Sequence, residues 1–275
     1  MNTITVPGLS VAFMAASCAF AFVLPAVLYI VLRKKLKARF VPLLIGAATF
    51  IVAALVAESA VHSVILGDGN ILSFLKANPL LFALYGGLMA GLFEESGRFA
   101  SFKLMRKKYN ESADALSFGV GHGGAEAILT LGVGMISSIV ISVIFNSGGA
   151  DTMLASLPEA QKQTLLAQGE ALAATPPGMF LVGIVERTGA VAFHIGASVL
   201  VYLAATGRGS FLYYPLAALL HLLLDIPAGL YQAGAWDDIW VIEAIVVVFS
   251  ALTLWFAVAR LKEADRRLKG TALEN

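Results

Sequence analysis

Two adjacent carboxylates and a guanidinium stand in a stretch of sequence that is otherwise apolar. They are Glu94, Glu95 and Arg98, in the segment GLFEESGRFASF. Glu94 and Arg98 are four residues apart and share one face of a helix, whereas Glu94 and Glu95 point about 100° apart. One guanidinium cannot readily neutralise both carboxylates, and a carboxylate without a full partner suits general acid or base catalysis. The alternative is an ion pair that only holds helices together.

Three histidines stand in similar apolar surroundings. His122 precedes Glu126 by four residues and His221 precedes Asp225 by the same interval, so each helix directs an imidazole and a carboxylate to one side. Imidazoles with a carboxylate are sufficient to bind Zn²⁺ and leave one position for water. We therefore predict a zinc site with four candidate ligands: His122, Glu126, His194 and His221. Asp225 is alternatively the group that orients His221 through its second ring nitrogen. The competing interpretation is a histidine that only joins two helices.

The composition places these residues in a membrane protein. Of the 275 residues, 59% are hydrophobic and 13% are charged, whereas a soluble domain carries about 25% charged residues. The single cysteine, Cys18, excludes an internal disulfide and a metal site with several cysteines. The N-terminus lacks a basic region, and the apolar run after it is too long for a signal peptide, so we expect a retained helix. We expect no nucleic-acid partner.

The apolar runs predict an all-α, polytopic membrane helix bundle. A helix needs about 20 apolar residues to cross a bilayer. Seven transmembrane helices are predicted, at 9–32, 40–65, 80–104, 114–146, 178–205, 211–232 and 238–260. The fourth run is too long for one straight span, so we expect it to project beyond the membrane or to break near its glycines.

These helices are expected to form one domain over residues 1–275. Its core covers roughly 80–232. The polar loop 147–177 is expected outside the cytoplasm, and its sequence LPEAQKQTLLAQGEALAAT predicts a short amphipathic helix.

The basic residues predict the orientation of the bundle. Lys and Arg favour cytoplasmic loops. Fifteen of the 19 lie on one side of the predicted membrane, in the segments 33–39, 103–108, 208 and 260–269. We therefore predict an N-terminus outside and a cytoplasmic C-terminus, in the cell (plasma) membrane of a bacterium.

Four of the predicted helices bring polar groups to the same depth. Glu94, His122, His194 and His221 each lie roughly 8–11 residues from the cytoplasmic end of their span. At a rise of about 1.5 Å per residue, all four lie about 12–17 Å from one face of the membrane. An ionisable residue at this depth is costly and points to function. A shared site explains the common depth.

The order of these motifs resembles a known group of membrane enzymes. EESGR (94–98), FGVGH (118–122) and HLLLD (221–225) read as E-E-x-x-R, F-x-x-x-H and H-x-x-x-D. This set resembles the CPBP superfamily of intramembrane proteases, which includes type II CAAX prenyl endopeptidases, Abi-type proteins and PrsW. The longer segments FGVGHGGAEA, ERTGAVAFHIGAS and HLLLDIPAG are most similar to the YhfC family of intramembrane metalloproteases.

The resemblance implies roles for individual residues. Glu94 would activate the attacking water, with Glu95 and Arg98 in support. His122 and His221 would hold either a metal or the oxyanion of the transition state.

The sequence departs from the prenyl endopeptidases in two places. Two residues separate Glu95 from Arg98, where those enzymes have three. Asp225 stands where they carry an asparagine or a similar residue beside the oxyanion. The substrates of the prenyl endopeptidases are therefore not carried over to this chain.

The expected function is hydrolysis of peptide bonds within the membrane. Substrates would be membrane-embedded or juxtamembrane protein segments, or lipidated peptides, reached from the lipid bilayer. Zn²⁺ on imidazoles would activate water, and in a metal-free version Glu94 alone would do so. The alternative is a proton-coupled membrane transporter that uses the same Glu, His and Arg cluster. A third reading is a scaffold without catalytic activity. The sequence predicts no oligomeric state.

Overall fold

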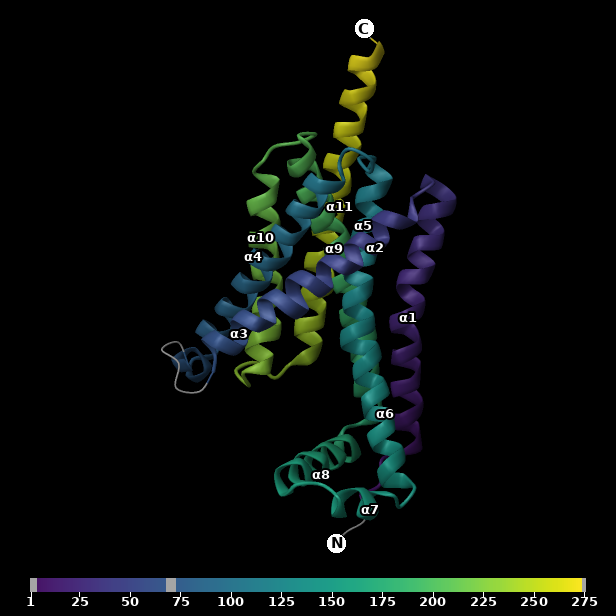
Figure 1. Ribbon diagram of the computed structural model, residues 1–275, viewed down its shortest axis with the longest axis vertical. Helices are drawn as coiled ribbons and strands as arrows, with labels where there is room; N and C mark the ends of the chain where they lie inside the picture. The colour runs from purple at the N-terminus through teal and green to yellow at the C-terminus, as the bar shows by residue number, and fades with distance from the viewer. Residues whose placement is uncertain (1–3, 68–72, 274–275) are drawn as a thin grey trace. The chain divides into compact units, whose positions relative to one another are not determined.

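The protein is all-helical in the part of the chain that the structure describes. This computed structural model describes residues 4–67 and 73–273, and it contains helices and no strands there (Figure 1). The chain divides into two compact units. One unit comprises residues 1–24 and 127–187, and the other, here called the site unit, comprises residues 25–126 and 188–275. The predicted single domain stays a prediction.

Within residues 4–67 and 73–273, six helical segments are long and apolar enough to cross a membrane. They are Gly8–Leu36, Phe40–Ile65, Ser112–Asn146, Pro177–Thr206, Tyr213–Gln232 and Ile239–Gly270. They coincide with six of the seven predicted spans, so the membrane-embedded, all-helical fold class is confirmed. The count of seven spans and the orientation of the termini stay predictions.

The remaining predicted span coincides with helix α4 (Pro79–Met105). Asn78 caps this helix, because its side chain accepts hydrogen bonds from the backbone N–H groups of Leu80 and Leu81, each at 3.1 Å. Its 27 residues would extend about 40 Å, which is enough to cross a bilayer. Glu94, Glu95 and the basic residues after them make α4 more polar than the six apolar segments. Neighbouring helices bury Glu94, Glu95 and Arg98, whereas Lys103 near the end of α4 is exposed.

The site unit is built from helices that surround α9. Its elements are the end of α1 (Gly8–Leu36), α2 (Phe40–Phe50), the π-helix η1 (Ile51–Glu58), α3 (Ser59–Ile65), the 3₁₀-helix η2 (Ser73–Ala77), α4, α5 (Ser112–Ala127) up to residue 126, α9 (Val182–Thr206) from residue 188 onward, α10 (Tyr213–Gln232) and α11 (Ile239–Leu273). In the apolar window of the segment that contains α9, 89% of residues are buried, against 11–33% in the other five segments. The core side chains of α4, α5, α10 and α11 pack against α9.

Helices α4 and α10 pack with close backbone contact, which fixes their relative position. A Cβ atom added to Gly91 would lie 2.5 Å from the carbonyl oxygen of Ala218, and one added to Gly87 would lie 2.7 Å from that of Leu222. The hydroxyls of Ser96 and Tyr214 form a hydrogen bond of 2.7 Å between the same helices. This contact matters because both helices carry residues of the predicted site.

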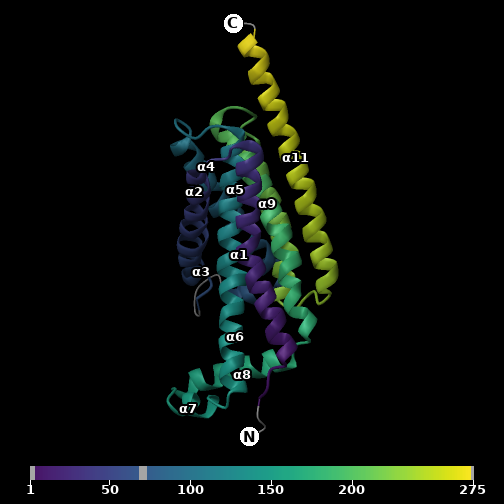
Figure 2. The same ribbon diagram turned by 90° about the vertical axis from the view of Figure 1, so that its right-hand side faces the viewer.

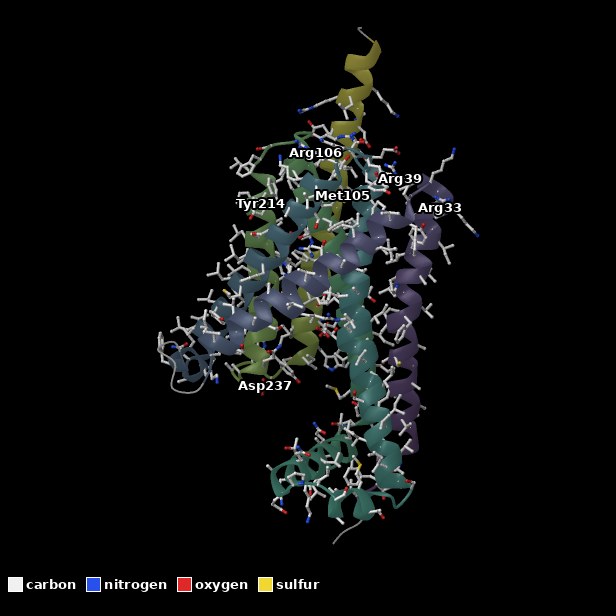
Figure 3. The ribbon with its side chains drawn as sticks, viewed as in Figure 1. Arg33, Arg39, Met105, Arg106, Tyr214 and Asp237 are labelled. Carbon is white, nitrogen blue, oxygen red and sulfur yellow. The ribbon has the colours of Figure 1, made fainter. Side chains whose placement is uncertain are left out.

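The basic residues gather at one end of the site unit. Figure 3 places Arg33, Arg39 and Arg106 at this end and Asp237 at the opposite end. Arg39 lies between two apolar segments and donates both hydrogen bonds of its guanidinium to the buried carboxylate of Asp114. These bonds raise the pKa of Arg39 above its ordinary value. The uneven charge agrees with the pattern from which the orientation is predicted.

The other unit contains the predicted loop helix. Its elements include η3 (Ile128–Gly132), α6 (Val133–Asn146), α7 (Ala150–Ala155), α8 (Glu159–Ala174) and the 3₁₀-helix η4 (Pro177–Leu181). Helix α8 confirms the predicted helix in the loop 147–177, and Figure 2 shows it beside α7. The long fourth run is not broken at its glycines, since η3 is a π-helical turn that joins α5 to α6 without interruption.

Candidate active site

Four helices of the site unit bring the predicted residues together. Glu94, Glu95 and Arg98 come from α4, His122 and Glu126 from α5, His194 from α9, and His221 and Asp225 from α10. The two adjacent glutamates, Arg98 and these three histidines are buried. The common depth expected from the sequence therefore corresponds to one cluster of side chains.

Glycines around His122 let α5 approach its neighbours. A Cβ atom added to Gly121 would lie 1.9 Å from the carbonyl oxygen of Leu43 on α2. One added to Gly123 would lie 3.0 Å from the Cβ atom of His194 on α9. The glycines thus bring backbones close together, as small residues do between membrane helices. Neighbouring helices fill the room beside these glycines.

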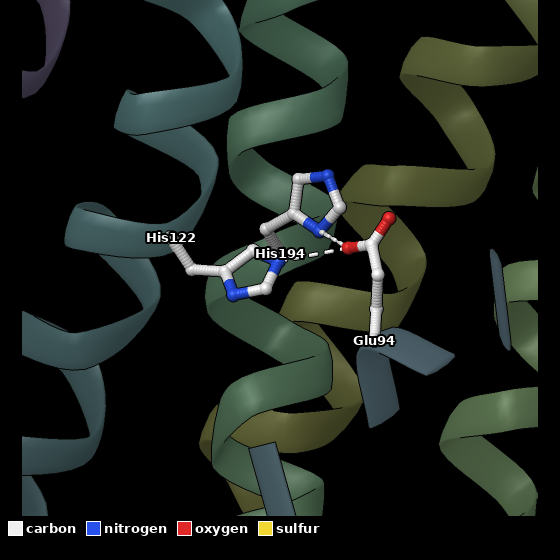
Figure 4. A group of neighbouring side chains, drawn as sticks. All are labelled: Glu94, His122 and His194. Atoms are coloured by element: carbon white, nitrogen blue, oxygen red, sulfur yellow. Dashed lines mark hydrogen bonds and ion pairs between the residues drawn. The ribbon is translucent and has the colours of Figure 1, made fainter. Parts of the chain in front are cut away.

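Glu94 is the carboxylate at the centre of the cluster. Its Oε2 atom accepts a hydrogen bond of 2.8 Å from His122 Nε2 and one of 3.3 Å from Arg98 Nη2. His194 Nδ1 lies 4.0 Å from the same oxygen (Figure 4). The other oxygen, Oε1, lies 3.9 Å from His221 Nε2. One carboxylate therefore faces three imidazoles, each from a different helix.

Glu95 faces a different set of partners. Its Oε1 atom accepts hydrogen bonds from Arg98 Nη1 and, at 2.8 Å, from His221 Nδ1. A carboxylate oxygen only accepts, so the Nδ1 atom of His221 carries a proton. This bond turns the Nε2 atom of His221 toward Glu94, in the way that carboxylates orient histidines at metal sites. Glu95 is thus placed to position His221 and Arg98.

His194 uses both of its ring nitrogens. Its Nδ1 atom lies 2.6 Å from Arg98 Nη2, and because a guanidinium only donates, Nδ1 is the acceptor. Its Nε2 atom therefore carries the proton of the neutral ring, next to the carboxylate of Glu126. Glu126 therefore lies on the side of His194 that faces away from Arg98.

Asp225 lies at the accessible side of the cluster. Its Oδ2 atom is 3.8 Å from His221 Nε2, and its side chain is 34% exposed. The distances from His221 Nε2 to Asp225 (3.8 Å) and to Glu94 (3.9 Å) are too long for direct hydrogen bonds. Such distances are typical of polar groups that are bridged by a third polar atom, such as the oxygen of a water molecule.

The residues fit a divalent metal ion. Glu94, His122 and His194 each offer a ligand atom, and these atoms lie within 4.8 Å of one another. Two imidazoles and one carboxylate form a donor set that Zn²⁺ accepts. The guanidinium of Arg98 already contacts two of these atoms, on Glu94 and His194. A cation bound to them would therefore lie next to a permanent positive charge.

Sequence reasoning missed a second polar cluster, on η1, α3 and α4. His62 Nδ1 lies 2.9 Å from the hydroxyl of Tyr85, and His62 Nε2 lies 3.0 Å from Oε1 of the buried Glu58. Glu58 ends the π-helical segment η1, and such segments are frequent at functional sites. A glutamate and a histidine four residues apart in an apolar run were the available signal.

Comparisons with known proteins identify the family of the chain. The family model "YhfC intramembrane metalloprotease" matches residues 20–246. The "Uncharacterized membrane protein YhfC" of Bacillus subtilis (strain 168) is 39% identical over 250 residues, which cover 90% of this chain and 95% of that protein. No solved structure matches the chain. The likeness to YhfC expected from the sequence is confirmed, whereas membership of the wider CPBP superfamily stays a prediction. The chain belongs to the YhfC intramembrane metalloprotease family.

Proposed function

We propose that this protein is an intramembrane peptidase. It hydrolyses peptide bonds in membrane-embedded or juxtamembrane segments of other proteins. The observation that carries the proposal is the buried carboxylate of Glu94, which faces imidazoles from three other helices. A buried carboxylate among polar groups is costly in a membrane protein and is retained where it serves a function.

The two oxygens of Glu94 have different tasks in this proposal. Oε2 is held by His122 and Arg98. Oε1 forms no hydrogen bond with the residues that the structure describes; it lies 3.9 Å from Nε2 of His221, which in turn lies 3.8 Å from Oδ2 of Asp225. A water molecule between these groups would give its proton to Oε1 and attack the carbonyl carbon of the substrate. Glu94 would then pass that proton to the leaving amine as the C–N bond breaks.

The remaining residues would stabilise charge and hold positions. His221 donates from Nε2 only as an imidazolium, in which both nitrogens carry protons. The carboxylates of Glu95 and Asp225 lie on either side of its ring and favour that positive charge. His221 is thereby placed to stabilise the oxyanion of the tetrahedral intermediate. Asp225 would hold the water and the imidazolium.

The metal version of the proposal uses the same residues. Glu94, His122 and His194 would hold a Zn²⁺ ion, with His221 beside them and Glu126 orienting His194. Zinc acts as a Lewis acid that makes water nucleophilic near neutral pH. Metal content of the purified protein, measured by mass spectrometry, tests this version. We expect about one zinc per chain, lost in His122→Ala and kept in the matched control His62→Ala. Equal zinc in both variants would place the metal elsewhere.

A cleavage assay tests the peptidase itself. The purified protein would be reconstituted with membrane proteins extracted from Bacillus subtilis, and new protein N-termini would be counted. Glu94→Gln keeps the shape of the side chain but removes the base, so we expect cleavage to fall about 10²- to 10⁴-fold. Glu170→Gln, in the exposed part of α8, is the matched control. Full cleavage by Glu94→Gln would refute the role of Glu94.

The second candidate is a proton-coupled transporter. One observation favours it: the Glu58, His62 and Tyr85 chain adds hydrogen-bonded polar groups that join η1, α3 and α4. Such chains serve as proton relays in transporters. Proton flux into liposomes that contain the protein separates the two candidates. Flux that is lost in Glu58→Gln, without any protein cleavage, would favour transport.

A further inference from the structure

A groove between α9 and α11 lies outside the cluster at Glu94. Its volume is about 630 Å³, and it is here called the α9–α11 groove. One part is apolar and includes Ala192, Leu254 and Trp255, and the other part is charged and includes Arg260, Lys262 and Arg266. Ala192 precedes His194 by two residues and therefore lies on nearly the opposite face of α9. The groove is thus separate from the proposed reaction.

The sequence of α9 accounts for the apolar part of the groove. A Cβ atom added to Gly196 would lie 3.1 Å from the Cα atom of Leu254, so α9 and α11 are in close backbone contact at this point. Ala192 stands one turn earlier on the same face. Its methyl group leaves the groove open beside this contact, where a larger side chain would fill it.

The charged part of the groove has more positive than negative charge. Glu263 forms ion pairs with Arg260, at 2.9 Å through one oxygen, and with Arg267 through the other. Lys262 and Arg266 are exposed and form no ion pair with any residue in the described ranges 4–67 and 73–273. Two cations therefore remain uncompensated at this end.

A buried donor also lacks an acceptor there. The Nε atom of Arg260 is covered, although the side chain as a whole is 41% exposed, and it has no hydrogen-bond partner among the described residues. An N–H group buried without an acceptor is costly, so such groups generally have a partner in the functional state. The Nε donor of Arg260 and the cations Lys262 and Arg266 are all complementary to one kind of ligand, an anion with several oxygen atoms.

The spacing along α11 matches the boundary of a membrane. Trp255 is 70% exposed, and tryptophan favours the interface between lipid and water. Arg260 follows it by about 7 Å along the helix, and Arg266 lies about 9 Å farther on. The headgroup layer of a bilayer leaflet is about 5–8 Å thick. The charged part of the groove thus begins at the headgroup layer and extends beyond it, and the apolar part runs from Trp255 at the interface toward the acyl chains.

We propose that the α9–α11 groove binds one anionic glycerophospholipid. Its phosphate accepts hydrogen bonds from Arg260, Lys262 and Arg266, and an acyl chain lies along Leu254 and Trp255. Free phosphate would satisfy the cations but would leave the apolar part of the groove open. A lipid with a net-neutral headgroup would leave the excess positive charge uncompensated.

Lipid binding in detergent tests this proposal without any use of catalysis. Phosphatidylglycerol and phosphatidylcholine with identical acyl chains would be titrated against the full-length protein, with native mass spectrometry as the readout. Each Lys or Arg near an anionic headgroup raises the affinity about five-fold. We therefore expect phosphatidylglycerol to bind about 10- to 30-fold more tightly than phosphatidylcholine. Equal affinity for the two lipids would overturn the proposal, whatever the variants show.

Variants locate the bound lipid. Lys262→Gln with Arg266→Gln should weaken the binding of phosphatidylglycerol about 10- to 30-fold. The matched control, Lys34→Gln with Lys35→Gln at the exposed end of α1, should change the affinity for phosphatidylglycerol less than two-fold. Ala192→Phe keeps every charge but fills the apolar part of the groove. It should therefore weaken lipid binding and leave the thermal stability of the lipid-free protein unchanged. An equal loss in the control, or stabilisation by inorganic phosphate equal to that by the lipid, would refute the site.

Discussion

Replacing Arg98 with methionine would remove the guanidinium that Glu94 and Glu95 share. Arg98 and Glu95 are fully buried, and Glu94 is nearly so. Removing one partner of a buried ion pair costs about 3–5 kcal/mol, because the other charge is left uncompensated. Arg98→Met leaves two such carboxylates, so we expect a loss of unfolding free energy at the upper end of this range. Glu95→Gln leaves the guanidinium in contact with Glu94, and we expect a loss at the lower end.

A double-mutant cycle measures the pair directly. Unfolding free energies in mild detergent would be compared for wild type, Arg98→Met, Glu95→Gln and the double variant. We expect the double variant to lose less than the sum of the single losses, by about 2–3 kcal/mol, because both charges of the pair are then absent. Additive losses, or a smaller loss for Arg98→Met than for Glu95→Gln, would refute the shared ion pair.

The remaining predictions concern packing and the ion pair between the partly exposed Arg39 and the buried Asp114, and thermal unfolding in detergent checks them. Gly121→Ala should prevent the close packing of α2 on α5 and cost several kcal/mol, because its Cβ atom would lie 1.9 Å from the backbone oxygen of Leu43. Gly134→Ala is the matched control, since nothing lies within 4 Å of its Cβ position, and a comparable loss there would contradict the packing argument. Arg39→Met should cost about 2–4 kcal/mol, because it leaves the carboxylate of Asp114 buried without its guanidinium. An unchanged unfolding temperature would show that this pair adds nothing.

The depth of the site follows from the sequence because helix geometry is regular. A residue's distance from the end of its span fixes its depth to within one turn. The common layer of Glu94, His122, His194 and His221 was predictable for this reason. The structure brings these four side chains into one cluster.

The pairing of residues within that layer was not predictable. It depends on how each helix is rotated about its axis, which contacts between helices decide. The contact of Gly91 with Ala218 sets α4 against α10, and Glu95 rather than Asp225 then bonds to His221 Nδ1. Local spacing pointed to pairs within one helix, whereas the shortest bonds of the histidines join different helices.

A single buried charge within an apolar helix is also hard to recognise from composition. Glu58 was overlooked because a single acid barely lowers the hydropathy of the apolar run around it. Glu58 bonds to His62, and the other partner of His62, Tyr85, belongs to a different helix, α4. A periodicity argument within one helix cannot find a hydrogen-bonded chain that joins two helices.

Isotope labelling tests the central claim most directly. The reconstituted protein would cleave extracted membrane proteins in water enriched in ¹⁸O, and mass spectrometry would read the new C-termini. Hydrolysis at the site predicts one ¹⁸O atom in each newly formed carboxylate with the wild type and none above background with Glu94→Gln. Unlabelled products, or equal labelling with both proteins, would contradict the claim that Glu94 activates water for peptide-bond hydrolysis.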